Sequence, residues 1–475
     1  MKKRILAALV ASAAVLSLAG CNTDNNSGSG AGNNNSTGNS STGDNSSAGG
    51  DSSTGGDNNS TPAADGDVLT ILAWTNNSDI ENMKKIFCKE TGTSEDKINI
   101  VACGNGGGDA REQYMQYLQA DGDADLMCLE ADWILQYIND DTLTSPLSAI
   151  GIEESNLANP YAYTVAIGKN EAGVLKGASF QATPGGFVYR ADLAEQHLGV
   201  KSPEEMQALI SDWTKFEETA AKLKEKGDMA ITATEAGLWQ VYQANRTTPW
   251  VKDGVVMMDN AEGFYEIVKN YTDKGYITGA TQWNDAWYAT VSNGDALGAF
   301  LSTWGMTDSS AGQLHNFAAE KEGADANMAF CAGPQEYFWG GTWLGVSTKC
   351  NSNDLAKQFV EFFTCNDETM EKYALETGDY CNNSVVMKKI VDEKSHTNKY
   401  LVGGQDQFAY FYEQAPKIKM DGLITKYDSR IKELFNNSVM DFAVNGKYAT
   451  KEEAINGFKD AVAADYQELK FEGEG

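Results

Sequence analysis

Tryptophan and acidic or amide side chains follow several short apolar runs of this chain. Trp74 and Asn76 come after the run 68–73, and Asp132 and Trp133 come after the run 125–129. A flat indole ring can cover the apolar face of a ligand, and amides or carboxylates can bond its hydroxyl groups. This combination is typical of a binding site. The candidate ligand-binding residues are Trp74, Asn76, Asp109, Asp132, Trp133, Trp239, Trp304, Trp339, Trp343 and Asp379.

The other tryptophans have weaker claims to a binding role. Trp283 and Trp287 are four residues apart and would share a helix face, which favours a core position. Trp213 lies on the apolar face of a predicted helix, and Trp250 has no distinguishing context. Trp339 and Trp343, by contrast, flank Gly340 and Gly341, whose missing side chains would let a ligand approach the backbone closely.

Catalytic chemistry has little support in the sequence. Glu130 and Asp132 could form the carboxylate pair of a glycoside hydrolase, but among 67 acidic residues some pair will always look suggestive. The G-x-S-x-G, P-loop and H-E-x-x-H motifs are absent, and the three histidines are isolated. Asp121, Asp123 and Asp125 have the spacing of a calcium loop, but Leu126 stands where that loop needs Gly. We therefore expect no catalytic residue, no metal and no cofactor.

The elements that must position these residues alternate between strands and helices. Residues 68–73, 97–103 and 125–129 are predicted strands. The first is followed by a helix with Ile80, Met83 and Phe87 on one face. This order predicts an α/β unit with a parallel sheet, in which ligands bind beyond the carboxyl ends of the strands. A second region begins near Phe187, and about 400 residues from Val68 onward are too many for one typical core.

The N-terminal 66 residues predict export and anchoring. Residues 1–20 have a basic start, a short apolar run and small residues before Cys21, as in a secretory signal. Leu18-Ala19-Gly20-Cys21 resembles a bacterial lipobox, which implies that Cys21 is lipidated. Residues 21–66 contain no large apolar residue and are expected to form a disordered tether. A coil of that length would average roughly 35–40 Å from end to end.

Charge and cysteine content limit the possible partners. The formal net charge of −30 excludes nucleic acid and anionic membrane surfaces as partners, since both would repel the protein. Contact with the membrane is expected through the lipid alone. Seven cysteines remain besides Cys21, and none forms a C-x-x-C motif, so zinc and thioredoxin-type chemistry have no support. Buried thiols are expected, although some pairing stays open: Cys88, Cys103, Cys128, Cys331, Cys350, Cys365 and Cys381.

Several segments in one order resemble the solute-binding proteins of ABC sugar importers, the maltose-binding-protein-like group. They cover nearly all of 68–390: ILAWTNNSDIENMKKIF, DADLMCLEADW, GGFVYRADLAEQHLGV, DWTKFEETAAKLKEKG, NGDALGAFLSTWGM, GGTWLGVSTKCNSNDLAKQFVEFFT and ETGDYCNNSVV. The resemblance implies an α/β, two-lobe periplasmic-binding-protein-like fold of type II. Each lobe would be a mostly parallel sheet flanked by helices, joined to the other by a hinge. Crossings are expected near Thr183, Leu301 and Cys365, giving 67–183 with 302–365 as lobe 1 and 184–301 with 366–475 as lobe 2.

The resemblance also implies a function. The protein is expected to be a monomeric bacterial lipoprotein on the extracellular face of the cytoplasmic membrane. It would capture a sugar between its lobes and deliver it to the transmembrane subunits of an ABC permease. Trp239 and Trp304 match positions where family members often present a ring to sugar, and the number of aromatic rings favours an oligosaccharide. A surface glycoside hydrolase, a receptor for a peptide or polyamine, and a sensor subunit remain alternatives.

Overall fold

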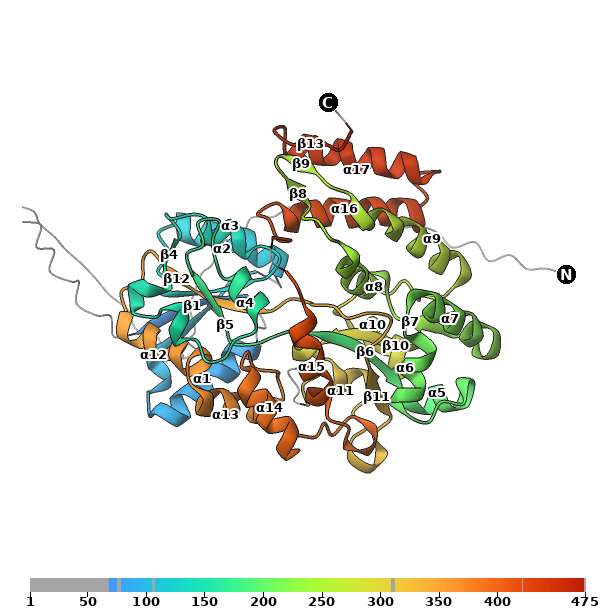
Figure 1. The fold of residues 1–475 in the computed structure, drawn as a ribbon, viewed down its shortest axis with the longest axis horizontal. Helices are drawn as coiled ribbons and strands as arrows, with labels where there is room; N and C mark the ends of the chain where they lie inside the picture. The colour runs from blue at the N-terminus through green and yellow to red at the C-terminus, as the bar shows by residue number, and fades with distance from the viewer. Residues whose placement is uncertain (1–67, 75–77, 105–106, 309–311, 421, 474–475) are drawn as a thin grey trace, which may run out of the picture. The chain divides into compact units, whose positions relative to one another are not determined.

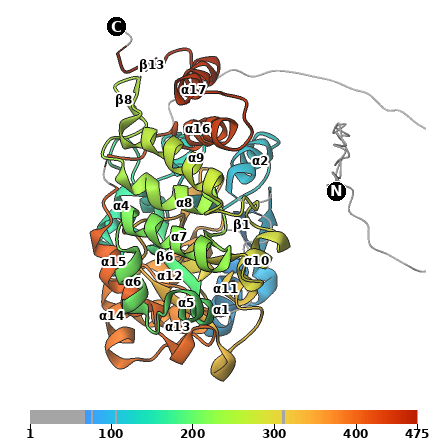
Figure 2. The same ribbon diagram turned by 90° about the vertical axis from the view of Figure 1, so that its right-hand side faces the viewer.

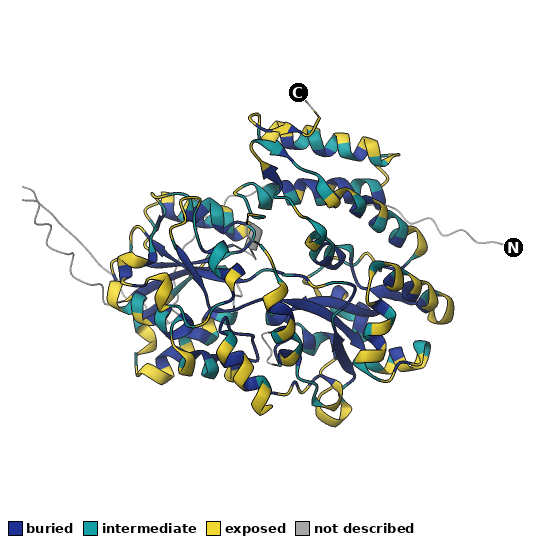
Figure 3. Ribbon diagram, viewed as in Figure 1, coloured by how far each residue is buried: buried dark blue, intermediate teal, exposed yellow. Residues whose placement is uncertain are grey.

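The structure is a computed structural model that describes residues 68–74, 78–104, 107–308, 312–420 and 422–473. The predicted signal, Cys21, the tether and Asn76 lie outside the described residues. Residues 62–475 form one compact unit. Within it, strands and helices gather around two larger sheets, whose strands are mostly buried (Figures 1 and 3). We call the two regions lobe 1 and lobe 2.

Lobe 1 is built on the strand order β2-β1-β3-β12-β4, with β5 also paired to β12. The strands β1 (Leu69–Ala73), β2 (Ile98–Ala102) and β3 (Leu126–Glu130) are parallel. The strand β12 (Thr342–Ser347) runs antiparallel to β3, β4 (Thr144–Ser145) and β5 (Gly177–Ser179). Its helices are α1 (Ser78–Thr91), α2 (Gly107–Gln119), α3 (Ile134–Ile138), α4 (Ala162–Ile167), α12 (Asn353–Thr364), α13 (Asp367–Thr377) and α14 (Ser384–Glu393).

Lobe 2 is built on the strand order β11-β6-β10-β7. The strand β6 (Gly185–Arg190) is antiparallel to β10 (Ala296–Ser302) and β11 (Met328–Cys331), and β10 is parallel to β7 (Ala230–Thr232). Its helices are α5 (Ala191–Leu198), α6 (Pro203–Ile210), α7 (Trp213–Gly227), α8 (Glu235–Tyr242), α9 (Phe264–Lys274), α10 (Asp285–Ser292) and α11 (Leu314–Phe317). Both sheets are thus mixed: parallel pairing is found for β1 with β2, β1 with β3, and β10 with β7, and the other pairs of these sheets are antiparallel, so the expectation of mostly parallel sheets was wrong.

The C-terminal part of the chain contacts both lobes. The helix α15 (Gln407–Gln414) packs against α14, and α16 (Asp428–Ala443) packs against α9 and α17 (Lys451–Asp465). A small sheet joins β8 (Val251–Lys252), β9 (Val255–Val256) and β13 (Lys470–Phe471). Figures 1 and 2 show α16 and α17 next to α9 at one end of lobe 2. This arrangement carries α16 to the junction of the lobes.

Two of the expected lobe boundaries differ from the structure. The strand β11 pairs with β6, so the chain stays in lobe 2 beyond residue 302 and returns to lobe 1 only near Gly340. The helix α13 packs on α1, and Tyr373 meets Phe180 with ring centroids 5.7 Å apart, so residues beyond 365 belong to lobe 1. Strand pairing and helix packing join distant segments, which a pass along the sequence does not reveal.

Local sequence explains why individual elements form. The side chain of Asp212 accepts a hydrogen bond from the backbone N–H of Lys215 at 2.8 Å and caps α7. Phe216, Ala220 and Leu223 recur at helical spacing and are buried on one face of that helix. Capping and an apolar stripe together favour the helix and its docking on the sheet of lobe 2.

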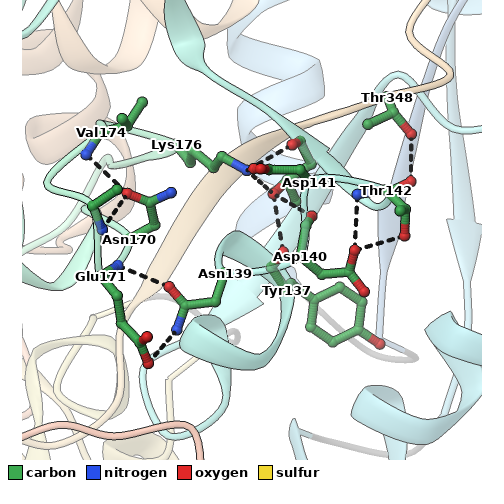
Figure 4. A network of polar contacts seen from close by, with 12 residues as sticks. Tyr137, Asn139, Asp140, Asp141, Thr142, Asn170, Glu171, Val174, Lys176 and Thr348 are labelled. Atoms are coloured by element: carbon green, nitrogen blue, oxygen red, sulfur yellow. Dashed lines mark hydrogen bonds and ion pairs between the residues drawn. The ribbon is translucent and has the colours of Figure 1, made fainter.

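A buried lysine ties the loops of lobe 1 together. Lys176 Nζ donates to Asp141 Oδ1 at 2.6 Å and to the backbone oxygen of Thr144 at 2.9 Å (Figure 4). Lys176 is buried and Asp141 is exposed, so the charge is neutralised at the surface of the lobe. This ion pair lies within lobe 1 and serves below as a control for contacts between lobes. None of the helices in the described ranges is long and apolar enough to cross a membrane.

Candidate functional site

Three tryptophans from separate segments meet where the chain passes between lobes. Trp304 follows β10, Trp339 precedes the return to lobe 1, and Trp283 precedes α10. Their ring centroids are 5.6 Å apart for Trp283 and Trp304, 5.8 Å for Trp283 and Trp339, and 5.3 Å for Trp304 and Trp339. Trp283 is 51% exposed, Trp304 is half-buried and Trp339 is 9% exposed. We call these three residues the tryptophan cluster; it offers an aromatic surface to solvent.

The exposure of Trp283 follows from where α10 begins. The Asn284 side chain accepts a hydrogen bond from the backbone N–H of Trp287 at 3.0 Å and caps the helix, which starts at Asp285. Trp283 therefore lies outside the helix, with φ of 70°. Trp287 is fully buried and packs on Phe317 with centroids 4.8 Å apart. The prediction that Trp283 and Trp287 share a helix face in the core was wrong for Trp283.

A pocket of about 460 Å³ lies between the lobes and contacts both. Ala131 and Asp132 come from the end of β3 in lobe 1, and Gln240 and Gln243 come from α8 and the turn after it in lobe 2. We call it the interlobe pocket. Its remaining lining residues are Ala244, Arg246, Thr247, Thr248, Trp250, Glu336, Tyr337, Phe338, Gly340, Lys417, Ile418, Lys419, Met420, Leu423, Ile424, Asp428 and Lys432.

The tryptophan cluster adjoins the interlobe pocket at Gly340. This glycine lines the pocket, and a Cβ atom built on it would lie 3.5 Å from Trp304 Nε1 and 3.6 Å from Glu130 Oε1. Its φ of 70° is in the left-handed region, where Gly is favoured. The pocket and the aromatic surface can therefore contact different parts of one elongated ligand.

Charged side chains connect the lobes beside the pocket. Asp132 of lobe 1 forms an ion pair with Lys432 of α16. Two hydrogen bonds run alongside, from Arg111 Nη1 to Ser429 Oγ at 2.9 Å and from Gln136 Nε2 to the backbone oxygen of Lys426 at 3.1 Å. These contacts hold the lobes together in this conformation.

Glu130 is the last residue of β3 and contacts Asp132. Burial and the nearby Asp132 carboxylate raise the pKa of Glu130 to about 8. Its Oε2 accepts a hydrogen bond from the backbone N–H of Asp132 at 2.8 Å. Its visible role is to hold the turn that presents Asp132.

Arg246 forms the most polar wall of the interlobe pocket. Its guanidinium lies over the ring of Trp250, 3.8 Å from the centroid, and Nη2 donates to the backbone oxygen of Thr248 at 2.9 Å. Arg246 Nε and Thr248 Oγ1 are buried and have no hydrogen-bond partner among the described residues. Burial lowers the pKa of Arg246 to about 10, although Asp428 and Asp259 oppose the shift. The pocket thus leaves a guanidinium donor unsatisfied.

Three predicted site tryptophans lie in the cores of the lobes. Trp133 packs against Tyr114 and Tyr137, with ring centroids 5.6 and 5.3 Å away. Trp239 packs against Phe264 and Phe435, each with a ring centroid 5.0 Å away. Trp343 donates from Nε1 to the backbone oxygen of Thr164 at 2.8 Å. All three are buried, so other protein groups cover their rings, and we do not include them in the proposed site.

The remaining candidates occupy varied positions. Trp74 is half-buried at the end of β1 and packs against the core of lobe 1, and Asp109 is exposed on α2. Asp379 is fully buried, and it accepts hydrogen bonds from Gln181 Nε2 at 2.6 Å and the Tyr373 hydroxyl at 2.9 Å. It is a satisfied structural carboxylate. The structure therefore brings Asp132, Trp304 and Trp339 to the junction of the lobes.

Sequence reasoning missed other members of the site. Trp283, Arg246, Trp250, Asp428 and Lys432 all contact the pocket or the tryptophan cluster. One signal was available for Trp283, because Asn284 is a favoured N-cap residue and so places Trp283 before the helix. No local sequence pattern indicated a site role for Lys432, which lies 300 residues from its partner Asp132.

Comparison with known proteins gives one family match and many structural ones. The profile of the bacterial extracellular solute-binding proteins matches residues 82–398. No curated protein sequence matches. A solved structure of an extracellular solute-binding protein of family 1 is 16% identical with a TM-score of 0.67, and the match covers 82% of this chain and 98% of that chain.

Two further solved structures have names that state a ligand or class. The ABC transporter associated binding protein from B. animalis subsp. lactis Bl-04, in complex with beta-1,6-galactobiose, is 15% identical with a TM-score of 0.68, covering 85% of this chain and 99% of that chain. The sugar-binding protein MalE from Xanthomonas citri is 15% identical with a TM-score of 0.62, covering 84% and 96%. At these identities the likeness concerns the fold, and it confirms the α/β class predicted from the sequence.

Proposed function

Because the chain belongs to the bacterial extracellular solute-binding protein family, as the sequence predicted, we propose that its solute is a sugar held where the lobes meet. The observation that carries this proposal is the tryptophan cluster. A pyranose ring has an apolar face of C–H groups and a rim of hydroxyls, and rings at different angles can cover more than one such face. Trp283, Trp304 and Trp339 come from three segments of the chain and leave an aromatic surface exposed.

An oligosaccharide fits this site better than a single sugar. The interlobe pocket has a volume of about 460 Å³ and lies next to the tryptophan cluster at Gly340. Gln240, Gln243 and Asp132 line it and could bond several hydroxyl groups. One sugar unit on the aromatic surface and another in the pocket would use both regions. Galactobiose and maltose are oligosaccharides that structurally similar proteins bind, which supports this size class.

Delivery to a membrane permease is part of the proposal. The family is extracellular, and a lipid on Cys21 would keep the protein at the membrane with a tether of about 45 residues. Sugar binding would favour the form in which the lobes are closed, and the closed form would dock on the transmembrane subunits of an ABC permease. The shift toward closure can be no larger than the preference of the ligand for the closed form. We further propose that the protein acts as a monomer.

We also propose that the bound sugar is not hydrolysed. The acidic residues nearest the cluster have structural partners, since Glu130 accepts a backbone hydrogen bond and Asp132 pairs with Lys432. Hydrolysis would need one carboxyl group to protonate the leaving oxygen and a second, ionised one across the bond. A polyamine is disfavoured too, because Arg246, Lys417, Lys419 and Lys432 all line the pocket.

Thermal unfolding of the purified protein against neutral and acidic mono- and oligosaccharides, peptides and polyamines tests the proposal. A ligand that binds only the folded form raises the melting temperature by mass action. We expect a rise with oligosaccharides and recovery of the intact sugar after long incubation. A rise with peptides or polyamines alone would contradict sugar binding, and shortened sugar products would contradict the absence of hydrolysis.

A further inference from the structure

The charged lining of the interlobe pocket is unusual for this chain. The protein carries a formal net charge of −30, yet the pocket is lined by four basic side chains and three acidic ones. The basic ones are Arg246, Lys417, Lys419 and Lys432, and the acidic ones are Asp132, Glu336 and Asp428. The pocket lining is thus slightly basic on a strongly acidic protein, which makes it a more favourable place for an anion than the rest of the surface.

Most of the acidic side chains in the pocket already have partners. Asp132 pairs with Lys432, and Glu336 lies 3.3 Å from Lys417 Nζ. Asp428 accepts hydrogen bonds from the backbone N–H and the hydroxyl of Thr425, and its carboxylate and that of Asp259 also favour the charged form of Arg246. No carboxylate of the described residues lies within ion-pair distance of Lys419. The lining therefore has one more basic than acidic side chain, and Lys419 is the basic one without a carboxylate partner in the described part of the chain.

Arg246 supplies the directional part of the site. Its guanidinium is fixed between the ring of Trp250 and the backbone oxygen of Thr248, and its buried Nε has no partner among the described residues. Thr248 Oγ1, also buried and without a partner in that part of the chain, can donate a second hydrogen bond. A held guanidinium N–H beside a hydroxyl suits a negatively charged oxygen, because charge-assisted hydrogen bonds are the stronger kind.

We propose that the interlobe pocket binds an anionic oxygen substituent, a carboxylate or a sulfate ester, carried by the sugar, so that the ligand is an acidic oligosaccharide. The inference rests on the proposed sugar-binding function and names its substrate class. One sugar ring lies on the tryptophan cluster, and the anionic group of the same or the next unit reaches Arg246. Lys419, which lies in the segment before α16 and also lines the pocket, adds a positive charge to the site.

Calorimetry with matched pairs of ligands tests this inference on the purified full chain. One pair is a uronic-acid oligosaccharide and the same oligosaccharide with its carboxyl groups reduced to alcohols; the other is a sulfated oligosaccharide and its desulfated form. We expect the acidic member of one pair to bind at least about tenfold more tightly, and the pair that shows the preference identifies the substituent. Its affinity should also fall with added salt, while that of the neutral member stays constant.

Two variants link the preference to the pocket. In Arg246→Gln the preference for the acidic member should fall to about twofold or less, because the acidic member loses more affinity than the neutral one. Lys252→Gln, an exposed change on β8 outside the pocket, should keep the full preference. If Arg246→Gln does not fold, the ligand pairs and the salt dependence still decide the question with the unchanged protein.

The outcomes separate this inference from the function on which it rests. Equal or tighter binding of the neutral members would overturn the acidic ligand class and leave sugar binding intact. Binding of no sugar from either pair, with binding of a peptide or polyamine, would overturn the proposed function itself. An unchanged preference in a folded Arg246→Gln protein would contradict the assignment of the anion site.

Discussion

Trp304 donates a hydrogen bond from its indole Nε1 to the backbone oxygen of Trp339 at 3.3 Å. The two rings meet nearly at right angles, at 80°, with centroids 5.3 Å apart. Because the bond runs from a side chain of lobe 2 to the segment that returns to lobe 1, it fixes the ring of Trp304 beside the crossing. The aromatic surface is therefore held in place before any ligand arrives.

Replacing Trp304 should weaken sugar binding without unfolding the protein. In Trp304→Ala we expect the Kd for the preferred sugar to rise at least about tenfold, or ~1.4 kcal/mol, because a stacking surface is lost. Calorimetry measures the Kd, and chemical denaturation should show a loss of stability of about 1 kcal/mol, since the ring is only half-buried. Trp213→Ala removes another half-buried indole of lobe 2 and should leave the Kd unchanged. Unaltered binding by Trp304→Ala would remove Trp304 from the site.

Trp283 and Trp287 should respond in opposite ways to the same substitution. Trp283→Ala removes a ring that is 51% exposed, so the free energy of unfolding should change by no more than ~0.5 kcal/mol while sugar affinity falls. Trp287→Ala empties a fully buried position and should cost about 3–5 kcal/mol of stability. Urea denaturation and calorimetry on both variants check the contrast. A large loss of stability in Trp283→Ala would show that its ring is structural.

The ion pair between Asp132 and Lys432 should favour the arrangement in which the lobes are held together. An ion pair with one partner exposed contributes on the order of 1 kcal/mol, so Asp132→Asn should shift the ratio of open to closed forms by about fivefold toward open. Pulsed electron paramagnetic resonance, with one spin label on each lobe and no ligand, measures the distance distribution. Asp141→Asn breaks the ion pair with Lys176 inside lobe 1 and should leave that distribution unchanged. If Asp132→Asn gave the same distance distribution as Asp141→Asn, the ion pair between Asp132 and Lys432 would have no role in closure.

Ionisation of Asp79 should reduce the stability of the protein as the pH rises through the acidic and neutral range. Burial and the nearby Asp379 raise the pKa of Asp79 to about 8, whereas in the unfolded chain it is about 4. Between these values the folded protein binds more protons than the unfolded one, so the free energy of unfolding decreases with rising pH. One such group contributes at most about 1.4 kcal/mol per pH unit.

Urea denaturation from pH 4 to pH 8 measures this slope. Asp79→Asn should make the slope of stability against pH less negative (or more positive) than in the unchanged protein, because this group can no longer ionise. Glu81→Gln, an exposed change on the same helix, should reproduce the slope of the unchanged protein. Identical slopes for the two variants would mean that Asp79 ionises in the folded protein as it does in the unfolded chain.

The sequence by itself determined the local elements and the family. The apolar face shared by Trp213, Phe216, Ala220 and Leu223 predicted α7, and short apolar runs predicted β1 and β3. These signals are local, since helical or strand periodicity involves residues that are near one another in the chain. The order of such segments was enough to predict the α/β class and the solute-binding family.

Only the tertiary structure decided which side chains form the site. Trp133 and Trp304 both follow strands, yet Trp133 is enclosed by Tyr114 and Tyr137 while Trp304 meets Trp283 in the cluster. Burial depends on what packs against a residue from elsewhere in the chain, and Asp132 finds Lys432 at a separation of 300 residues. Contacts at that distance leave no periodic trace in the sequence, because they arise when distant strands and helices pair and pack.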